Sequence, residues 1–297
     1  MPARLLLLGV LFCFSVIVAV SPAVAQESAP SLWSLGIAND SFFDQDRGYT
    51  SGWDIAFTPL ASPFTVRIGQ DIYTPDRDNS EMPPPGQHPY AAWLYARGDY
   101  RYQLCRVVLM TTSVSFGTTG ERALGEEFQD VAHQVLGFDE YEGWDSQVSE
   151  RWGWIVGVEL LWQQPLLRTP AGYGLDLITM LEGQGGNILV DLSAGVGVRF
   201  GYHLPELSAT PEPNAPKSVY FTLYGERKIV DKNVFLEGVS SRDYSVEPER
   251  GVNTLSCGVH WREGAYQVDL DFYFPEQEFK DQNLTYRYGV LRLSYWY

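Results

Sequence analysis

Apolar and polar residues alternate with a period of two along much of this chain. Between Tyr266 and Phe274, every second position is apolar, and Gln267, Asp269 and Asp271 lie between the apolar positions. The same alternation runs from Val190 to Phe200. This period is typical of a β-strand with one apolar and one polar face. Its repetition along the chain predicts an all-β fold.

The apolar face of these segments is unusually rich in aromatic residues. In the segment from Trp152 to Trp162, tryptophans stand near both ends of a run of Val and Leu. A strand of about ten residues rises roughly 25 Å when it is tilted as in a membrane barrel, which matches the apolar band of an outer membrane between its aromatic girdles. We therefore expect the apolar face to contact lipid and the polar face to line a lumen.

Segmentation of the chain by this alternation predicts twelve strands. They are expected near residues 33–40, 49–58, 64–71, 91–100, 104–117, 152–163, 174–182, 188–201, 218–228, 253–262, 265–274 and 285–297. An even number of strands is required of a single-chain bacterial barrel. With both termini in the periplasm, the outer loops are 41–48, 72–90, 118–151, 183–187, 229–252 and 275–284. The prediction is one twelve-stranded antiparallel transmembrane β-barrel of the outer membrane over residues 26–297, with a short helix in a long outer loop.

The first 25 residues have the features of a cleaved signal peptide. Arg4 precedes an apolar run from Leu5 to Val20, and Ala23-Val24-Ala25 forms a small-x-small cleavage site. No later stretch has 18 consecutive apolar residues, so nothing else is expected to span an inner membrane as a helix. Residues 1–25 are thus assigned to export, and the chain to the outer membrane of a Gram-negative bacterium.

After cleavage the chain keeps two cysteines, Cys105 and Cys257. A disulfide is feasible in an oxidising periplasm. However, Cys257 has the parity of Leu255 and Val259, which places it on the lipid face. This parity argues against a structural disulfide.

The net charge is −16. Such a negative chain is not expected to bind nucleic acid. It can still bind an anionic glycolipid if a divalent cation bridges the two. We expect a monomer, because one barrel accounts for the whole mature chain.

Polar residues that the barrel itself does not require gather at the outer end of the predicted strands. Asn39 and Asp40 end the first strand, residues 46–50 enter the second, and Gln70-Asp71 ends the third. His133 lies in the loop 118–151. Function is therefore expected at the outer-leaflet side. The plain alternative is that Asn39-Asp40 only opens a turn, since both residues favour turns.

Segment 123–136 is predicted to form an amphipathic helix. Its apolar stripe is Leu124, Phe128, Val131, Ala132 and Val135, and its other face carries Glu126, Gln129, Asp130 and His133. Such a helix can pack its stripe on the barrel rim or on the bilayer and direct the histidine toward a strand end. In the alternative interpretation, His133 is a solvated surface histidine.

Several spaced motifs together resemble the lipid A 3′-O-deacylase family. They are Ala38-Asn39-Asp40-Ser41-Phe42-Phe43 with Asp46 to Gly52, Gln70 to Pro75, Gly125 to His133 ending at Gly137, and Gly143 to Gln147. Arg227 to Asn233 adds a shorter match. The resemblance extends from about residue 33 to the C-terminus.

The resemblance implies an outer-membrane barrel that removes the 3′-linked acyloxyacyl chain of lipid A by calcium-dependent ester hydrolysis. The catalytic positions of the family fall on Asn39, Asp40, Thr50 and His133. Six residues after the histidine the family often has glutamate, and this chain has Asp139. The shorter side chain leaves a direct or a water-mediated metal contact open.

These residues suit ester hydrolysis, which needs an activated nucleophile and a positive centre for the developing oxyanion. His133 is assigned as the general base that activates water. Calcium (Ca2+) would polarise the carbonyl, with Asp40, Asp139 and backbone oxygens near Gly48 as its ligands. Asn39 and Thr50 would orient substrate or water.

Two other classes of function remain open from the residues alone. An outer-membrane phospholipase would carry a serine nucleophile, and the sequence has no G-x-S-x-G motif, although spacing alone leaves Ser41 and Ser51 available. A non-enzymatic pore or adhesin is the third class. Three tyrosines would crowd a pore, because their parity directs them into the lumen: Tyr220, Tyr224 and Tyr273.

The expected substrate is lipid A or lipopolysaccharide. Its phosphates could be contacted by Arg227, Lys228 and Lys232.

Overall fold

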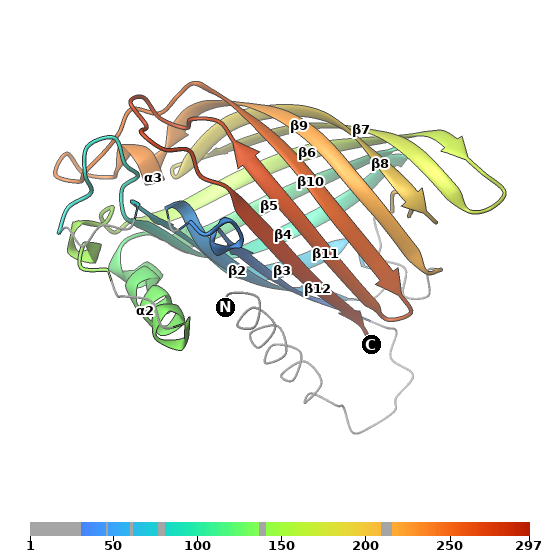
Figure 1. Ribbon diagram of the computed structural model, residues 1–297, viewed down its shortest axis with the longest axis horizontal. Coiled ribbons are helices and arrows are strands. Elements are labelled where there is room, and N and C mark those ends of the chain that lie inside the picture. The colour runs from blue at the N-terminus through green and yellow to red at the C-terminus, as the bar shows by residue number, and fades with distance from the viewer. Residues whose placement is uncertain (1–30, 46, 60–61, 77–80, 137–140, 209–215) are drawn as a thin grey trace.

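The computed structural model shows a closed β-barrel (Figure 1) and describes residues 31–297 apart from 46, 60–61, 77–80, 137–140 and 209–215. The expected signal peptide, residues 1–25, lies outside the described residues. The barrel has twelve antiparallel strands. They are β1 (Leu32–Asn39), β2 (Gly48–Thr58), β3 (Phe64–Thr74), β4 (Ala91–Cys105), β5 (Val108–Thr118), β6 (Trp152–Arg168), β7 (Tyr173–Gly186), β8 (Leu189–Tyr202), β9 (Ser218–Asn233), β10 (Gly251–Glu263), β11 (Tyr266–Pro275) and β12 (Tyr288–Trp296).

Each strand pairs with its neighbours in sequence, and β1 closes the barrel against β12, from Leu32 opposite Trp296 to Asn39 opposite Gly289. All twelve predicted strands are present, and the predicted fold class is confirmed. Several strands are longer than their apolar alternation indicated: β6 has 17 residues and β7 has 14. As a result, the predicted loop 183–187 is reduced to residues 187–188, because β7 continues to Gly186.

The remaining elements are short and lie at one end of the barrel, which we call the α2 end (Figure 1). They are η1 (Ser41–Phe43), η2 (Glu121–Ala123), α2 (Gly125–Leu136), η3 (Trp144–Ser146) and α3 (Val234–Glu237). The predicted helix in the long loop is confirmed as α2. Within the described part of the chain, no helix is long and apolar enough to cross a membrane.

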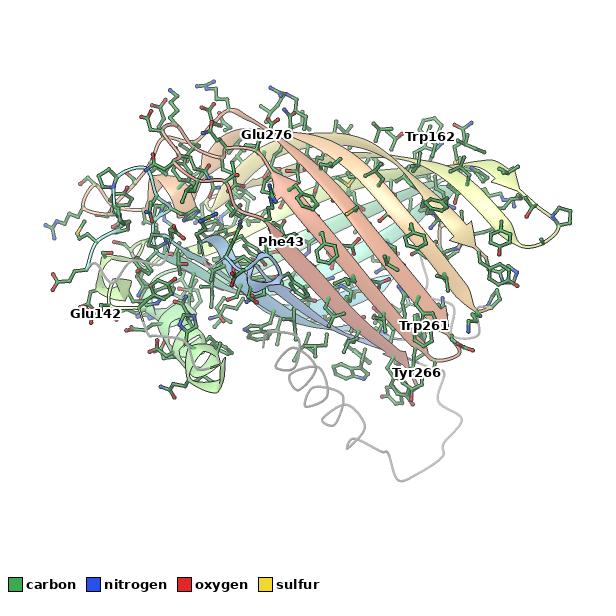
Figure 2. All side chains as sticks on the ribbon, in the orientation of Figure 1. Phe43, Glu142, Trp162, Trp261, Tyr266 and Glu276 are labelled. Carbon is green, nitrogen blue, oxygen red and sulfur yellow. The ribbon has the colours of Figure 1, made fainter. Side chains whose placement is uncertain are left out.

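The outer face of the barrel carries the apolar side chains, as the alternation predicted. Val114, Phe116 and Val196 are each more than half exposed. Figure 2 places Trp162, Trp261 and Tyr266 at the end of the barrel opposite to α2. Aromatic rings at the edge of an apolar outer band are typical of a barrel in an outer membrane. Cys257 lies on this outer face between Leu255 and Val259, and both Cys105 and Cys257 are free thiols.

Charged and aromatic side chains fill the lumen. Asp54 forms ion pairs with Arg67 at 2.6 Å and with Arg292 at 2.8 Å. The ring of Tyr273 stacks on Tyr288 with centroids 4.8 Å apart. The prediction that tyrosines crowd the interior is confirmed, and this filling does not favour an open pore.

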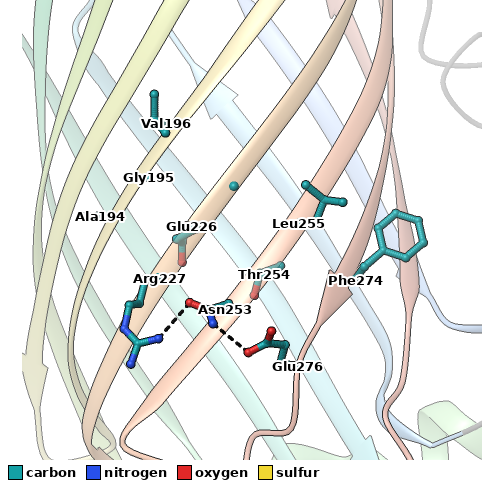
Figure 3. A pocket seen from close by; sticks show the side chains of 11 residues that line it. Ala194, Gly195, Val196, Glu226, Arg227, Asn253, Thr254, Leu255, Phe274 and Glu276 are labelled. Carbon is teal, nitrogen blue, oxygen red and sulfur yellow. Dashed lines mark hydrogen bonds between the residues drawn. The ribbon is translucent and has the colours of Figure 1, made fainter.

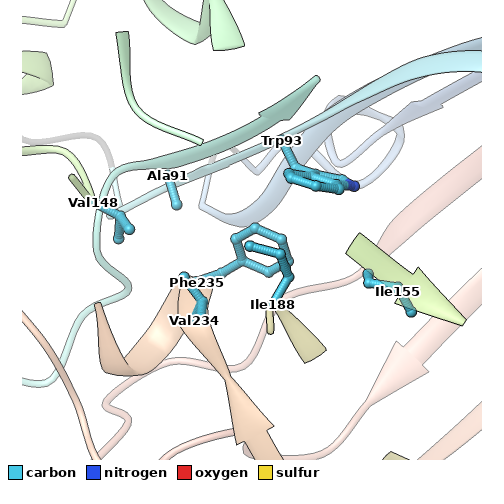
Figure 4. Packing of buried hydrophobic residues seen from close by; sticks show 7 residues of the cluster. All are labelled: Ala91, Trp93, Val148, Ile155, Ile188, Val234 and Phe235. Atoms are coloured by element: carbon cyan, nitrogen blue, oxygen red, sulfur yellow. The ribbon is translucent and has the colours of Figure 1, made fainter. Parts of the chain in front are cut away.

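A buried apolar cluster covers the lumen at the α2 end (Figure 4). Its members are Ala91, Trp93, Val148, Ile155, Ile188, Val234 and Phe235. Phe235 reaches it from α3, whose N-cap Asn233 accepts a hydrogen bond from the Phe235 backbone N–H at 3.0 Å. The Phe235 ring stacks on Tyr73 at 5.0 Å. Residues from three strands, β3, β4 and β6, and from three connections thus pack into one cluster, which we call the stopper.

His88 is buried beside this stopper. Its burial predicts that the free energy of unfolding depends on pH. Its ring stacks on Tyr73 at 5.1 Å, and burial lowers the pKa of His88 to about 4. An unfolded histidine titrates near pH 6.5, so between about pH 6.5 and 4 the unfolded chain binds more protons than the folded chain. The stabilisation is complete above pH 6.5 and falls by roughly 3 kcal/mol as the pH approaches 4.

The measurement is the apparent free energy of unfolding of the detergent-refolded barrel between pH 7.5 and 4. The wild type should lose more stability below pH 6.5 than His88→Gln, which cannot titrate. Parallel pH profiles for the two chains would contradict the assignment to His88.

Candidate active site on the outer wall of the barrel

The ends of β1 and β2 bring four of the predicted site residues together. Asp40, which follows β1, is 1% exposed, and its backbone N–H donates to the carbonyl of Thr50 at 3.2 Å. One oxygen of its carboxylate, Oδ2, accepts the backbone N–H of Arg47 at 2.6 Å. The backbone carbonyl of Gly48 accepts the Thr50 hydroxyl at 3.5 Å. Asn39, Asp40, Gly48 and Thr50 therefore form one cluster.

Two residues of the cluster also shape the local backbone. The Asn39 side chain accepts the backbone N–H of Ser41 at 2.7 Å, as in an Asx turn. Gly48 has φ +70, and a Cβ there would lie 2.2 Å from the Tyr286 ring. The Asn39 side chain therefore does open a turn, as in the plain alternative. This turn is compatible with a second role for the Asn39 amide.

A β-bulge determines which way Thr50 points. The register between β2 and β3 shifts between Tyr49 and Ser51, so that Thr50 is the extra residue. Its hydroxyl is 2.5 Å from that of Thr74, which has the same parity on β3 as the exposed outer residues Val66 and Ile68. Strict alternation would have put Thr50 in the lumen. The bulge turns it to the outer wall.

The outer face of β3 changes character toward the α2 end. Phe64, Val66 and Ile68 are exposed, whereas Gln70, Ile72 and Thr74 on the same face are buried. The Gln70 side-chain amide donates to the carbonyl of Leu124 at 3.0 Å and also to that of Ala123, while its carbonyl accepts the Trp53 indole N–H at 2.9 Å. Gln70 thus fastens the start of α2 to the outside of the wall.

Helix α2 turns its polar face to the barrel and its apolar face outward. Gln129 and His133 are buried, at 2% and 6% exposed, whereas Phe128 is 42% and Val131 61% exposed. The Trp144 indole N–H donates to Gln129 Oε1 at 2.8 Å. The helix lies beside the outer wall in Figure 1. Of the apolar stripe, Phe128 stacks on Trp53 of β2 with ring centroids 5.4 Å apart, while Val131 points away from the barrel. Packing of the stripe on the bilayer stays a prediction. His133 is not a solvated surface histidine.

A second apolar cluster holds α2 and its flanking turns on β3 and β4. It consists of Ile72, Tyr90, Ala92, Ala123, Tyr141 and Trp144. The Tyr141 ring lies 5.5 Å from the ring of His133. Neither Tyr141 nor Thr74 was predicted as a site residue, although Thr74 lies in the motif from Gln70 to Pro75. Only the fold brings them to His133 and Thr50.

The donors present suit a hard cation with few acidic ligands. Asp40 supplies a buried carboxylate and Gly48 a backbone carbonyl, and calcium accepts both together with water. Among the described residues, no group of three or more His, Cys, Asp or Glu side chains could hold a metal ion. Asp139, the third predicted ligand, lies outside the described residues. Asp40 and Gly48 thus offer oxygen donors of the kind that calcium accepts, and the calcium site stays a prediction.

Replacing Gln70 by alanine should loosen α2. The change leaves two backbone carbonyls and the Trp53 indole N–H without their buried partner, a loss of about 1–3 kcal/mol per unsatisfied group. Limited proteolysis of the folded barrel should cut within 119–151 at least tenfold faster in Gln70→Ala, since tenfold corresponds to about 1.4 kcal/mol. Gln103→Ala, at an exposed strand end, should leave the rate unchanged. Equal cleavage of the two variants would contradict this role.

The sequence matches the family described as Outer membrane protein LpxR over residues 10–297. The chain belongs to this LpxR family. The match confirms the family expected from the spaced motifs, and it places the chain in the Gram-negative outer membrane. A search of curated proteins gave no match.

The solved structure of a Salmonella protein shows the same fold. LpxR from Salmonella typhimurium superposes with a TM-score of 0.79 at 19% identity, covering 90% of this chain and 100% of that chain. The β-domain of the Bordetella autotransporter BrkA gives 0.44 at 11% identity, covering 90% and 99%. The KdgM porin gives 0.39 at 7% identity, covering 89% and 98%. The likeness to the Salmonella protein supports the twelve-stranded barrel of this LpxR family member.

Proposed function

We propose that this LpxR family member is a lipid A 3′-O-deacylase, which hydrolyses the ester of the 3′-linked acyloxyacyl chain in the outer leaflet. The observation that carries the proposal is the burial of His133 between helix α2, to which it belongs, and the outer wall of the barrel. An ester whose acyl chains remain in the bilayer can reach such a site laterally. It need not enter the lumen, which the stopper covers.

The chain's own residues have separate roles in this reaction. His133 accepts a proton from a water molecule, whose oxygen bonds to the ester carbonyl carbon. When the bond between that carbon and the sugar oxygen breaks, the proton on His133 passes to the sugar oxygen. The products are a sugar hydroxyl and the acyloxyacyl carboxylic acid, which keeps the second proton of the water and then ionises by releasing it to solvent. The Asn39 amide and the Thr50 hydroxyl orient the water and the ester.

Asp40, the Gly48 carbonyl and Asp139 are the residues that would hold calcium. When bound there, the ion supplies a positive centre for the carbonyl oxygen. Burial of Asp40 supports this role, because a carboxylate removed from water is stabilised by a cation or by hydrogen bonds. The Arg47 backbone N–H occupies Oδ2 and orients the carboxylate.

The same lateral access would suit a phospholipase, so the test must separate the two substrates. Lipid A and phospholipids are extracted from cells that express the chain and from cells with an empty vector, and both are analysed by mass spectrometry. Lipid A should lose one acyloxyacyl unit while phospholipids stay unchanged. Accumulation of lysophospholipid with intact lipid A would indicate a phospholipase. No change in either, with the folded barrel verified by heat-modifiable gel migration, would contradict both.

The proposal places the α2 end of the barrel on the outer-leaflet side and requires a single chain. All the residues assigned a role come from one barrel, and the expected monomer stays a prediction. The substrate is lipid A within lipopolysaccharide.

A further inference from the structure

The outer wall carries a groove on β8 to β11, separate from α2 and its cluster (Figure 3). Its volume is about 710 Å³. On the floor, Ala194 and Gly225 face outward from neighbouring strands, and a Cβ at Gly225 would meet nothing within 4 Å. Val196, Leu255 and Phe274 form the walls. The groove exists because two small residues interrupt an otherwise bulky apolar surface.

The groove is continuous with the lipid-facing surface of the barrel. Val196 and Leu255 are 55% and 52% exposed. Phe43 of η1 packs edge-on against Phe274 at 5.6 Å. Apolar walls of this kind, open to the bilayer, suit an acyl chain rather than a soluble ligand.

Polar residues close the groove at the end nearer to α2. Arg227 donates to the Asn253 side-chain carbonyl at 3.0 Å, and the Asn253 amide donates to Glu276 at 2.8 Å (Figure 3). Among the described residues, Arg227 forms no ion pair, and its Nε and Nη2 atoms have no hydrogen-bond partner. The guanidinium of Arg287 lies 5.8 Å above the Phe274 ring. Arg287 thus adds a second guanidinium near this end, where Arg227, Glu226 and Glu276 line the groove.

We propose that this groove binds one lipopolysaccharide molecule, with an acyl chain over Gly225 and a lipid A phosphate on Arg227. A guanidinium presents paired N–H donors that match phosphate geometry, and Arg287 adds a second positive charge beside it. Lipid A combines a phosphate and acyl chains at the depth where this polar end meets the apolar walls. The bound molecule is a resident lipid and not the substrate, because the groove lies strands away from His133. The proposal uses the outward orientation of the α2 end but not the catalytic chemistry.

Two glycines on the lipid face give a matched test. Gly225→Leu fills the groove, while Gly185→Leu adds the same side chain on β7, where a Cβ also meets nothing within 4 Å, outside the groove. Both changes are made in a His133→Gln chain, so that bound lipid is not consumed. Native mass spectrometry of the refolded barrel in detergent, titrated with diphosphorylated lipid A, measures the binding.

Gly225→Leu and Arg227→Gln should each weaken binding about tenfold. Gly225→Leu removes the apolar surface that holds the acyl chain, and Arg227→Gln removes one charge-assisted contact. Gly185→Leu should bind like the parent chain, and Arg227→Lys should retain part of the affinity. Equal affinity in Gly225→Leu and Gly185→Leu would overturn the proposal. Equally tight binding of phosphatidylglycerol or of dephosphorylated lipid A would overturn the assignment to lipopolysaccharide.

A second readout avoids substitutions in the groove. Cys257 faces lipid two residues from Leu255, whereas Cys105 is exposed at the end of β4. Diphosphorylated lipid A should slow alkylation of Cys257 by N-ethylmaleimide and leave Cys105 unaffected. An unchanged rate at Cys257 in saturating lipid A would also contradict occupancy of the groove. Since neither readout involves hydrolysis, the groove and the proposed deacylase activity can fail independently.

Discussion

Replacement of His133 by glutamine is expected to reduce lipid A deacylation by about 10²–10⁴-fold, the usual contribution of a general base. Glutamine keeps a polar side chain of similar length in a position that is 6% exposed, but it cannot accept a proton from water at neutral pH. The α2 helix should remain in place, because Gln129, Gln70 and the apolar cluster around Trp144 hold it.

The measurement is the rate of release of the 3′-acyloxyacyl chain from purified lipid A in detergent with calcium present. His203→Gln is the matched control. His203 follows β8, far along the chain from α2, and its ring contacts the Lys217 carbonyl. Its activity should equal that of the wild type. Activity of His133→Gln within a factor of about three of the wild type would remove the histidine as general base and leave a purely structural role.

Removal of calcium should have the second largest effect. A chelator in excess is expected to lower the rate at least about 100-fold, in line with the loss of one oxyanion-stabilising contact, and added calcium should restore it. Asp40→Asn should behave like partial chelation. The amide keeps the shape and the acceptor for the Arg47 N–H but loses the charge, so higher calcium is needed for the same rate.

Calcium titrations of wild type, Asp40→Asn and Asp281→Asn would test this. Asp281 is exposed and has φ 60, a conformation that asparagine also tolerates, so its titration should match the wild type. Magnesium should restore less activity, because it prefers a tighter octahedral shell than backbone carbonyls and water around one carboxylate provide. Full activity in excess chelator would exclude a calcium requirement.

The predictions for His133 and for calcium have one physical basis in common, which is the orientation of helix α2 on the wall. A helix that buried its apolar stripe on the barrel would leave His133 in water. Here Phe128 and Val131 are instead partly or largely exposed, while Gln129 and His133 are buried against the wall. In the proposed function, a lipid ester would meet this buried base at the outer wall.

The positions of the strands were predictable because alternation reports one local property, which face of a strand contacts lipid. The ends of strands were less predictable. β6 continues to Arg168 and β7 to Gly186 beyond the apolar band, where backbone pairing persists but lipid no longer selects apolar residues. The turn between β4 and β5 likewise falls at 106–107 rather than near 101–103.

The residues of the candidate site could be predicted from the sequence, but their position on the barrel wall could not. The motifs identified Asn39, Asp40, Gly48, Thr50 and His133, and chain order alone put them near one end of the barrel. Tyr141 and Thr74 gave no comparable signal, because each acquires a neighbour in the site only when distant segments pack. Gln70, which ended a predicted strand as a polar rim residue, proves to be the anchor of α2.

The number of strands, the lipid-facing surface and the residues capable of chemistry could be predicted from the chain alone, since each of these depends on composition and period along the chain. That the cluster stands on the outer side of the wall became evident only from the folded barrel. The bulge at Thr50 reverses the direction that strict alternation assigns to it. Helix α2 buries Gln129 and His133 against the wall and leaves Val131 exposed, because contacts with β3, β4 and Trp144, and not the apolar stripe alone, set how the helix lies.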